Sequence, residues 1–158
     1  MKEMTEQQVL FKLTTMCSQA EHCTGEMLDK MKKWGLAEDA QARIMAYLTK
    51  EKYVDDERFC RFFVGDKIKY DKWGRRKIEQ ALYMKHVGRD ISDPVLDAIP
   101  DEKYIEILRP LINSKRKTVK AKSEYEANMK LIKFALGRGF EMKIIRQCMD
   151  GAEDIDDD

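Results

Sequence analysis

The sequence has little of the residues that build turns: its 158 residues include only three prolines and eight glycines. An all-β fold needs many tight turns, which these residues dominate, so their scarcity argues against a sandwich or barrel. No run approaches the roughly 18 consecutive apolar residues of a membrane-spanning helix. The opening residues, MKEMTEQQ, lack the apolar core of a signal peptide. We therefore expect a cytoplasmic protein with no membrane association.

Cysteine is sparse and scattered, at Cys17, Cys23, Cys60 and Cys148, with no Cys-x-x-Cys pair. In a reducing compartment such residues are small core side chains or free thiols. Cys17, His22 and Cys23 could in principle share a metal, but their spacing fits no common zinc pattern and no second half-site exists. We expect no metal.

Recognisable catalytic patterns are also missing. The two histidines, His22 and His86, stand apart and outside any known nucleophile motif. There is no Gly-x-x-x-x-Gly-Lys phosphate loop, and Gly137-Arg138-Gly139 ends a helical pattern, as a C-terminal cap does. The acidic run 55–57 is explained as a helix start. We expect no catalytic residue and no cofactor; a carboxylate or metal site assembled across helices is the enzymatic alternative.

What is abundant favours helices. Apolar residues make up 43% and charged residues 37% of the chain, and strong helix formers dominate. Apolar spacing and capping residues predict an all-α fold of nine helical segments. The signals are capping boxes at Thr5/Gln8 and Ser123/Glu126, N-caps at Thr24 and Asp55, a proline at the first position of a short helix at Pro94, and a kink or break at Pro110.

A repeat of about 50 residues is visible at the ends of three helices. Leu36, Val87 and Phe140 are spaced by 51 and 53 residues, and apolar residues precede each at matching offsets. This predicts three tandem three-helix units, 5–53, 54–99 and 100–149, without a β-sheet. No single unit buries enough apolar surface alone, so the units must stack, which predicts an elongated, curved, solenoid-like body.

The net charge of +1 hides an asymmetry. The last nine residues, 150–158, hold six acids and no base, whereas the preceding 149 residues hold 30 bases and 23 acids, a formal charge of +7. Such a tail is expected to be disordered and solvated. It is either a solubility segment or a decoy that competes with nucleic acid for the protein's own basic surface.

The basic residues cluster in two segments. Residues 67–77 hold six cations against the single acid Asp71, and residues 107–123 hold six cations and no acid. Two such segments on a small body predict a surface that faces a polyanion. The run Lys115-Arg116-Lys117 is the weaker signal, because it falls at a helix end, where the helix dipole itself favours cations.

One helix start breaks the usual charge rule. Helix N-termini favour acids, yet Gly74 is followed by Arg75, Arg76 and Lys77. A phosphate or carboxylate there would meet free backbone N–H groups and three cations together. The alternative is a solvated basic face. Trp73 next to it is either a stacking platform for a base or, more simply, a packing anchor under the turn.

Three stretches of the sequence resemble the RecX family of bacterial recombinase regulators. They are Tyr53-Val54-Asp55-Asp56-Glu57-Arg58-Phe59-Cys60, Lys72-Trp73-Gly74-Arg75-Arg76-Lys77-Ile78 with Leu82-x-x-Lys85, and Leu136-Gly137-Arg138-Gly139-Phe140. The resemblance covers most of residues 5–149. Two positions depart from the family pattern, since Cys60 replaces a small alanine and His86 replaces a glycine.

The resemblance implies three tandem three-helix units that bind the groove of a RecA–DNA filament, single-stranded or duplex, and restrain strand exchange and ATP hydrolysis in DNA repair, recombination and the SOS response. The sequence leaves the oligomeric state open, and a monomer is the default expectation. The residues expected to face filament DNA or an acidic recombinase surface are Lys69, Lys72, Trp73, Arg75, Arg76, Lys77, Lys115, Arg116 and Lys117. The alternative is a helix-turn-helix transcriptional regulator, because three-helix units can present a recognition helix.

Overall fold

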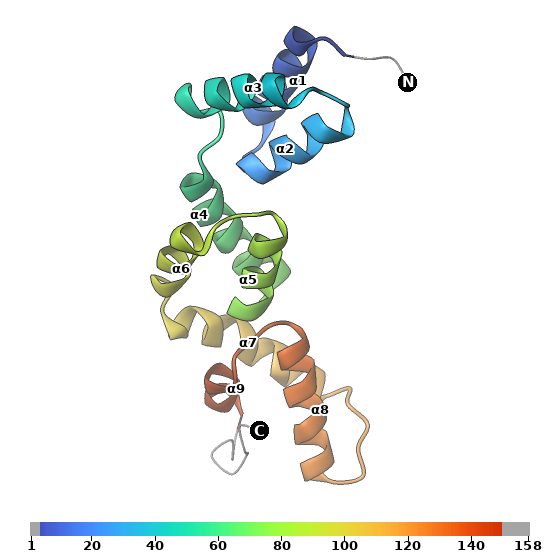
Figure 1. Cartoon of the computed structure of the whole chain (residues 1–158). Coiled ribbons are helices and arrows are strands. Elements are labelled where there is room, and N and C mark those ends of the chain that lie inside the picture. The colour runs from blue at the N-terminus through green and yellow to red at the C-terminus, as the bar shows by residue number, and fades with distance from the viewer. Residues whose placement is uncertain (1–3, 150–158) are drawn as a thin grey trace. The chain divides into compact units, whose positions relative to one another are not determined.

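The computed structural model describes residues 4–149 of the chain, and over this range it contains helices and no strand (Figure 1). The prediction of an all-α fold is confirmed. In order, the elements are α1 (Glu6–Gln19), α2 (Thr24–Lys33), α3 (Glu38–Lys50), α4 (Asp56–Asp66), the π-helical turn η1 (Lys67–Asp71), α5 (Arg75–Met84), α6 (Arg89–Asp97), α7 (Asp101–Arg116), α8 (Glu124–Gly137) and α9 (Met142–Cys148).

The described residues form two compact units. Unit 1 comprises residues 4–63 and 82–95, and unit 2 comprises residues 64–81 and 96–149. The boundaries 5–53, 54–99 and 100–149 and the elongated shape stay predictions, and the acidic segment 150–158 lies outside the described residues.

Unit 1 has a core built from one face of each of its first three helices. α3 packs against α1 and α2, and the buried cluster consists of Val9, Leu13, Met27, Met31, Ile44, Leu48 and Val54. In unit 2, α7 is the central helix, since η1, α8 and α9 all pack against it. Its buried face carries Tyr104, Leu108 and Ile112, spaced by four residues as a single helical stripe requires.

The helix starts show which capping signals are reliable. Thr5 and Gln8 form the predicted capping box, and the Asp55 carboxylate accepts the N–H of Arg58 as predicted. The second box is half formed: Ser123 accepts the N–H of Glu126, but the Glu126 carboxylate accepts the N–H of Lys122 instead of that of Ser123.

The prediction that Thr24 caps a helix is wrong by one residue. Cys23 is the extended N-cap residue, and Thr24 is the first residue of α2. The Thr24 hydroxyl donates to the Asp56 carboxylate at 2.8 Å, so it does not cap its own helix.

The prediction that Pro94 is the first residue of a helix is wrong, and so is a division of the helix at Pro110, while a kink there stays a prediction. Pro94 lies inside α6, which begins earlier, at Arg89, because the carbonyl of Gly88 accepts the first N–H groups of that helix. Pro110 lies on the exposed side of α7, which runs through it as one helix. A proline on the solvent side is tolerated because water can satisfy the carbonyl that it leaves without a partner.

The repeat spacing arises because the same type of turn ends three different helices. Gly35, His86 and Gly139 each have a left-handed backbone, with φ of 74°, 63° and 92°. The next residue in each case, Leu36, Val87 or Phe140, donates its N–H to the carbonyl five residues earlier. This is the Schellman ending of a helix. His86 therefore adopts the glycine conformation despite its side chain.

Within residues 4–149, none of the helices combines the length and the apolar character that crossing a bilayer requires.

The strained turn gives a stability prediction. A non-glycine residue in the left-handed region costs about 1–2 kcal/mol, so His86→Gly should raise the free energy of unfolding by about 1 kcal/mol. The reciprocal change, Gly35→Ala, should lower it by a similar amount through backbone strain alone, since nothing lies within 4 Å of its added Cβ. Urea unfolding followed by circular dichroism measures both. Equal stability of His86→Gly and the parent would contradict the strain at this turn.

Candidate functional site

The basic segment 67–77 folds around Trp73 in unit 2. The turn η1 ends at Lys72, whose left-handed φ of 57° redirects the chain before the tryptophan. The Trp73 ring is half-buried, and the ammonium groups of Lys67 and Lys77 lie 5.1 and 4.8 Å from its centroid. A ring that already holds two cations fits the packing-anchor interpretation better than an open stacking platform.

Two glycines let the start of α5 touch the turn after α8. A Cβ on Gly74 would lie 2.4 Å from backbone atoms of Gly139 and Phe140, and a Cβ on Gly139 would lie 2.5 Å from the backbone nitrogen of Lys77. At this Gly74–Gly139 contact, the N–H of Gly74 donates to the Arg138 carbonyl at 2.8 Å. Any larger residue would force the two backbones apart.

This contact corrects the expectation of an open anion site at the helix start. The N–H of Arg76 donates to the Gly139 carbonyl at 3.0 Å, so this donor is not free for a phosphate. An anion bound here must therefore rely on the cationic side chains more than on the backbone.

The expectation of three uncompensated cations is wrong for Arg75. Its guanidinium lies 2.7 Å from the Asp97 carboxylate and 3.8 Å from that of Glu79. Burial alone would lower the pKa of Arg75, but the hydrogen bond to Asp97 and the nearby Glu79 raise it above its ordinary value. Arg75 is thus held inside unit 2 by local acids and is not displayed to solvent as its neighbour Arg76 is.

The remaining cations of this segment are displayed. Lys69, Lys72 and Arg76 are exposed, and within the described part of the chain none of them forms an ion pair with a carboxylate. Lys69 lies 5.2 Å from the ring of Tyr70, which is itself 67% exposed. Exposed cations beside an exposed aromatic ring can contact both the phosphates and the bases of a nucleic acid.

The second basic run lies at the end of α7 in the same unit. Lys115, Arg116 and Lys117 are exposed, and none pairs with a carboxylate among residues 4–149. Arg116 instead donates to the amide oxygen of Asn128 at 3.1 Å, and Lys115 lies 5.3 Å from the ring centroid of Phe134. Here too the helix dipole accounts for part of the charge.

Arg138 connects the two basic segments, and sequence reasoning missed this role. Its guanidinium donates to the carbonyls of Asp71 and Lys72, at 2.9 and 3.3 Å, and also lies 5.7 Å from the Phe134 ring. The Phe134 ring therefore contacts the cationic groups of both Lys115 and Arg138. We call the exposed and half-exposed cations on the two sides of this link the cationic surface: Lys69, Lys72, Arg76, Lys77, Lys115, Arg116 and Lys117.

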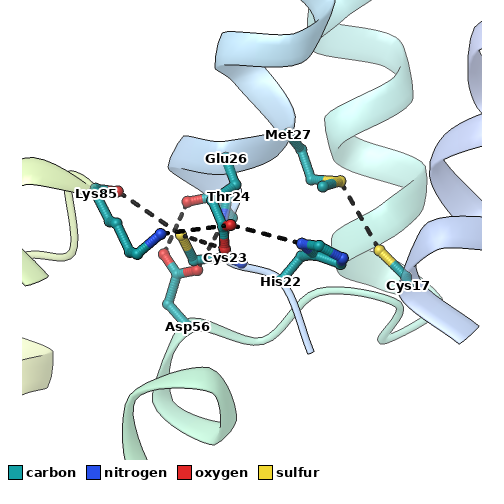
Figure 2. Close-up of polar contacts among 8 residues, drawn as sticks. All are labelled: Cys17, His22, Cys23, Thr24, Glu26, Met27, Asp56 and Lys85. Carbon is teal, nitrogen blue, oxygen red and sulfur yellow. Dashed lines mark hydrogen bonds and ion pairs between the residues drawn. The ribbon is translucent and has the colours of Figure 1, made fainter. Parts of the chain in front are cut away.

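Unit 1 contains a different polar cluster, at the start of α2 (Figure 2). The Glu26 carboxylate accepts the N–H and thiol of Cys23, at 3.1 and 3.4 Å, and lies 3.5 Å from the Lys85 ammonium and 3.6 Å from His22. The Asp56 carboxylate accepts both the N–H and the hydroxyl of Thr24. These contacts tie α2 to α4 and to the turn after α5, which is a structural role.

Cys17, His22 and Cys23 each have a neighbour within unit 1, which for His22 is the Glu26 carboxylate. The Cys17 thiol faces the sulfur of Met27 at 3.8 Å (Figure 2), and Cys23 also contacts the Lys85 carbonyl. Across residues 4–149, no group of three or more His, Cys, Asp or Glu side chains is arranged to hold a metal ion.

All four thiols are held in the protonated form. Burial raises the pKa of Cys23 to about 12 and that of Cys60 to about 11, and it also raises the pKa of Cys17 and Cys148. The thiolate is the nucleophilic form, so burial makes these thiols weaker nucleophiles, and three of them, Cys23, Cys60 and Cys148, belong to the buried core.

Two family models match the part of the chain that carries the cationic surface. The model described as "RecX, second three-helix domain" matches residues 55–96, and the one described as "RecX, third three-helix domain" matches residues 101–149. The chain belongs to the RecX family. The curated relatives are named regulatory proteins, and the three-helix domains of the family agree with the all-helical structure.

Curated RecX relatives are similar over most of the chain. The regulatory protein RecX of Caldanaerobacter subterraneus subsp. tengcongensis is 30% identical over 125 residues, which are 78% of this chain and 60% of that protein. That of Oceanobacillus iheyensis is 32% identical over 135 residues, 83% of this chain and 49% of that protein. The chain thus spans about half the length of these relatives.

Solved RecX structures share the fold. The crystal structure of RecX from Lactobacillus salivarius has a TM-score of 0.83 at 18% identity and covers 95% of this chain and 97% of that one. A second crystal structure, of a regulatory protein RecX, has the same TM-score and identity and covers 90% of this chain and 72% of that one.

The Gly74–Gly139 contact predicts a position-specific loss of stability. Gly74→Ala should lower the free energy of unfolding by about 1–3 kcal/mol, because its Cβ meets backbone that cannot rotate away. Gly65→Ala in α4 is the matched control: nothing lies within 4 Å of the added Cβ, so it should gain about 0.5–1 kcal/mol. Thermal unfolding measures both, and a neutral Gly74→Ala would show that the two segments do not touch.

The Glu26 cluster predicts a pH effect. Burial alone would raise the pKa of Glu26, but hydrogen bonds from Cys23 and the charges of Lys85 and His22 lower it below its ordinary value of 4.5. A group with a lowered folded-state pKa contributes stability that is complete above its ordinary pKa and is lost as the pH falls through the lower value. Glu26→Gln should therefore cost about 1 kcal/mol at neutral pH and lose less stability below pH 4.5 than the parent chain does.

Urea midpoints between about pH 3 and pH 7 measure this effect, since this range spans the ordinary carboxylate pKa. Glu106→Gln, at an exposed position on α7, is the control and should leave the pH profile of the parent unchanged. The interpretation is wrong if Glu26→Gln follows the same acid profile as the parent.

Proposed function

We propose that this chain regulates the RecA recombinase by binding the RecA–DNA filament and restraining its strand exchange and ATP hydrolysis. The observation that carries the proposal is the cationic surface of unit 2, whose exposed members have no carboxylate partner among residues 4–149. The family membership and the names of the curated relatives support a regulatory role.

Local stability alone does not account for the cationic surface. Other cations of the chain are paired with carboxylates. Arg75 lies 2.7 Å from Asp97, and Arg58 lies 2.8 Å from Glu21. Arg76 and Lys69 have no such partner in the described residues. An unneutralised cluster on a folded body is the electrostatic footprint of a polyanion, and filament DNA supplies one phosphate for each nucleotide.

Within this proposal, the site residues have two roles. Lys69, Lys72, Arg76, Lys77 and Lys115–Lys117 contact phosphates or an acidic RecA surface. Trp73 and Arg75 position the turn that carries them, because both side chains are already engaged inside unit 2. The protein acts as a cytoplasmic monomer.

A helix-turn-helix mode through α5 is not favoured. Such readers place the N-terminal residues of a recognition helix against base edges in the major groove. The start of α5 instead packs against the backbone of Arg138, Gly139 and Phe140. The backbone at the N-terminus of this helix is therefore covered by its own unit, although the Arg76 side chain is exposed.

A charge-matched pair of variants tests the proposal. The triple variant Lys69→Gln, Arg76→Gln and Lys117→Gln should weaken inhibition of RecA ATP hydrolysis on single-stranded DNA at least tenfold. The plot of the logarithm of the binding constant against the logarithm of salt concentration should also become less steep. Its slope should fall in magnitude by about 0.7 for each phosphate that the variant no longer contacts. The control triple variant, Lys32→Gln, Lys33→Gln and Lys50→Gln, removes three exposed cations of unit 1 and should inhibit like the parent.

Titration of the parent chain into RecA on single-stranded DNA, with ATP hydrolysis and filament length as readouts, is the first measurement. No effect at micromolar protein would refute the proposal. Binding of the two triple variants to DNA without RecA then separates the two contacts. A loss confined to the RecA-coated strand would assign the surface to RecA, and a loss on bare DNA would assign it to phosphates.

A further inference from the structure

Helix α8 carries apolar side chains on two sides. One side packs within unit 2, where α8 lies against α7 and α9 (Figure 1), and its buried residues are Leu131, Ile132 and Ala135. Beside it runs a row of exposed apolar side chains, since Tyr125 is 75%, Met129 43% and Leu136 42% exposed. Large apolar side chains that gather in one exposed patch mark an interaction surface.

The exposed row has the spacing of a coiled-coil contact. Together with Ile132 at its inner edge, it reads Tyr125, Met129, Ile132 and Leu136, separated by four, three and four residues. This is the alternation of the a and d positions of a heptad. The four residues, which we call the α8 seam, span about 17 Å at 1.5 Å per residue. In a coiled coil such a row is covered by a second helix that lies along it.

The surface of α8 is hollowed beside the seam. An open groove runs along the helix, and its lining residues are Glu126, Met129, Lys130, Ile132, Lys133 and Leu136. In coiled coils, each a or d side chain enters a hole formed by four residues of the facing helix. Three members of the α8 seam and Lys133 stand at the positions that form one such hole. The groove is therefore shaped to receive an apolar side chain of a second helix.

The charges beside the seam are complementary to those of a second copy of the same helix. Glu126 and Lys133 directly follow Tyr125 and Ile132, so both lie along the same side of the seam. Suppose that two copies of α8 run antiparallel, with Met129 of each facing Ile132 of the other. Glu126 of each copy then lies beside Lys133 of the other copy. Two-fold symmetry forms this attractive pair twice.

A parallel arrangement lacks this match. It would place Glu126 and Lys133 beside Ala121 and Asn128 of the other copy, which carry no charge. Both charged groups are available for the antiparallel pairing. Lys133 is exposed and has no carboxylate partner among residues 4–149, and the Glu126 carboxylate is 3.3 Å from Lys130 of its own helix at the surface.

We propose that two copies of this chain associate through antiparallel α8 helices, with the α8 seam as the buried contact and Glu126–Lys133 pairs along its edges. Four seam positions bury less than the roughly 1,600 Å² of a standard interface, so the dissociation constant should be on the order of 10–100 μM. The inference goes beyond the proposed function. That function concerns the monomer bound to the filament, whereas this association concerns the chain that is free in solution.

Charge reversal in the full chain tests the pairing. Glu126→Lys would place two lysines side by side at each edge of the dimer, and Lys133→Glu would place two carboxylates there. Each single variant should therefore dimerise about tenfold more weakly than the parent. The double variant Glu126→Lys, Lys133→Glu restores opposite charges and should dimerise like the parent. Sedimentation equilibrium measures the dissociation constants.

An equimolar mixture of the two single variants gives the sharpest result. One variant then supplies lysine at both edge positions and the other supplies glutamate, so both pairs are attractive again. The weight-average mass of the mixture should exceed that of either variant alone at the same total concentration. The control mixture combines Glu106→Lys with Lys103→Glu, which reverse exposed charges on α7, and should associate like the parent.

The apolar contact has its own matched pair of variants. Met129→Gln removes an apolar side chain from the α8 seam and should weaken dimerisation about tenfold. Met84→Gln, at a methionine of unit 1 that is 68% exposed, should leave dimerisation unchanged. Circular dichroism should show parental helix content for both variants, because glutamine and methionine have similar helix propensities.

The inference is overturned if the parent sediments as a monomer up to several hundred micromolar, a range above the expected constant. A monomer whose stability falls with Met129→Gln would show that the same chain covers the seam, and this also refutes association. A mixture no heavier than its components contradicts the antiparallel pairing. The RecA assay decides the proposed function independently: inhibition of RecA by a chain that stays monomeric would refute only the association through α8.

Discussion

The close approach of backbone to backbone at two glycines is the constraint on which the rest of the structure depends. In unit 1 a Cβ on Gly25 would lie 2.1 Å from the Lys85 carbonyl oxygen, and in unit 2 a Cβ on Gly74 would lie 2.4 Å from Gly139 and Phe140. Each contact sets the start of one helix against the left-handed turn that ends another. The two contacts occupy equivalent places, but only the one in unit 2 is surrounded by unpaired cations. The same kind of backbone contact is thus purely structural in unit 1, whereas in unit 2 it lies next to exposed cations.

Local patterns were enough to predict the helices and the repeated turn. Apolar spacing and capping residues such as Thr5 act within one or two helical turns, so the sequence alone carries that information. The three Schellman endings were visible as apolar residues at 36, 87 and 140, because each must donate to the carbonyl five residues earlier. Pro94 was misplaced because its preference for a first helical position was outweighed by the turn at Gly88, which starts the helix sooner.

Pairings between distant residues were beyond the sequence. Nothing local indicates that Asp97 neutralises Arg75, that Asp56 holds Thr24, or that Arg138 reaches back to the carbonyl of Asp71. The basic character of the candidate site was predictable from composition, whereas its division into engaged and displayed cations depends on which carboxylates the fold brings near. Arg75 and Arg76 are adjacent and chemically identical, yet only one remains exposed and unpaired in the described residues.

The burial of the thiols has a practical consequence. Cys23, Cys60 and Cys148 are buried and Cys17 is half-buried, and burial raises the pKa of all four thiols, so maleimide and iodoacetamide should react with them more slowly than with an exposed cysteine. A single cysteine introduced at an exposed position, such as Lys50, would then be modified selectively in the otherwise native chain. Fluorophores or spin labels can therefore be attached without first replacing core residues, which leaves the packing that those sulfur atoms fill undisturbed.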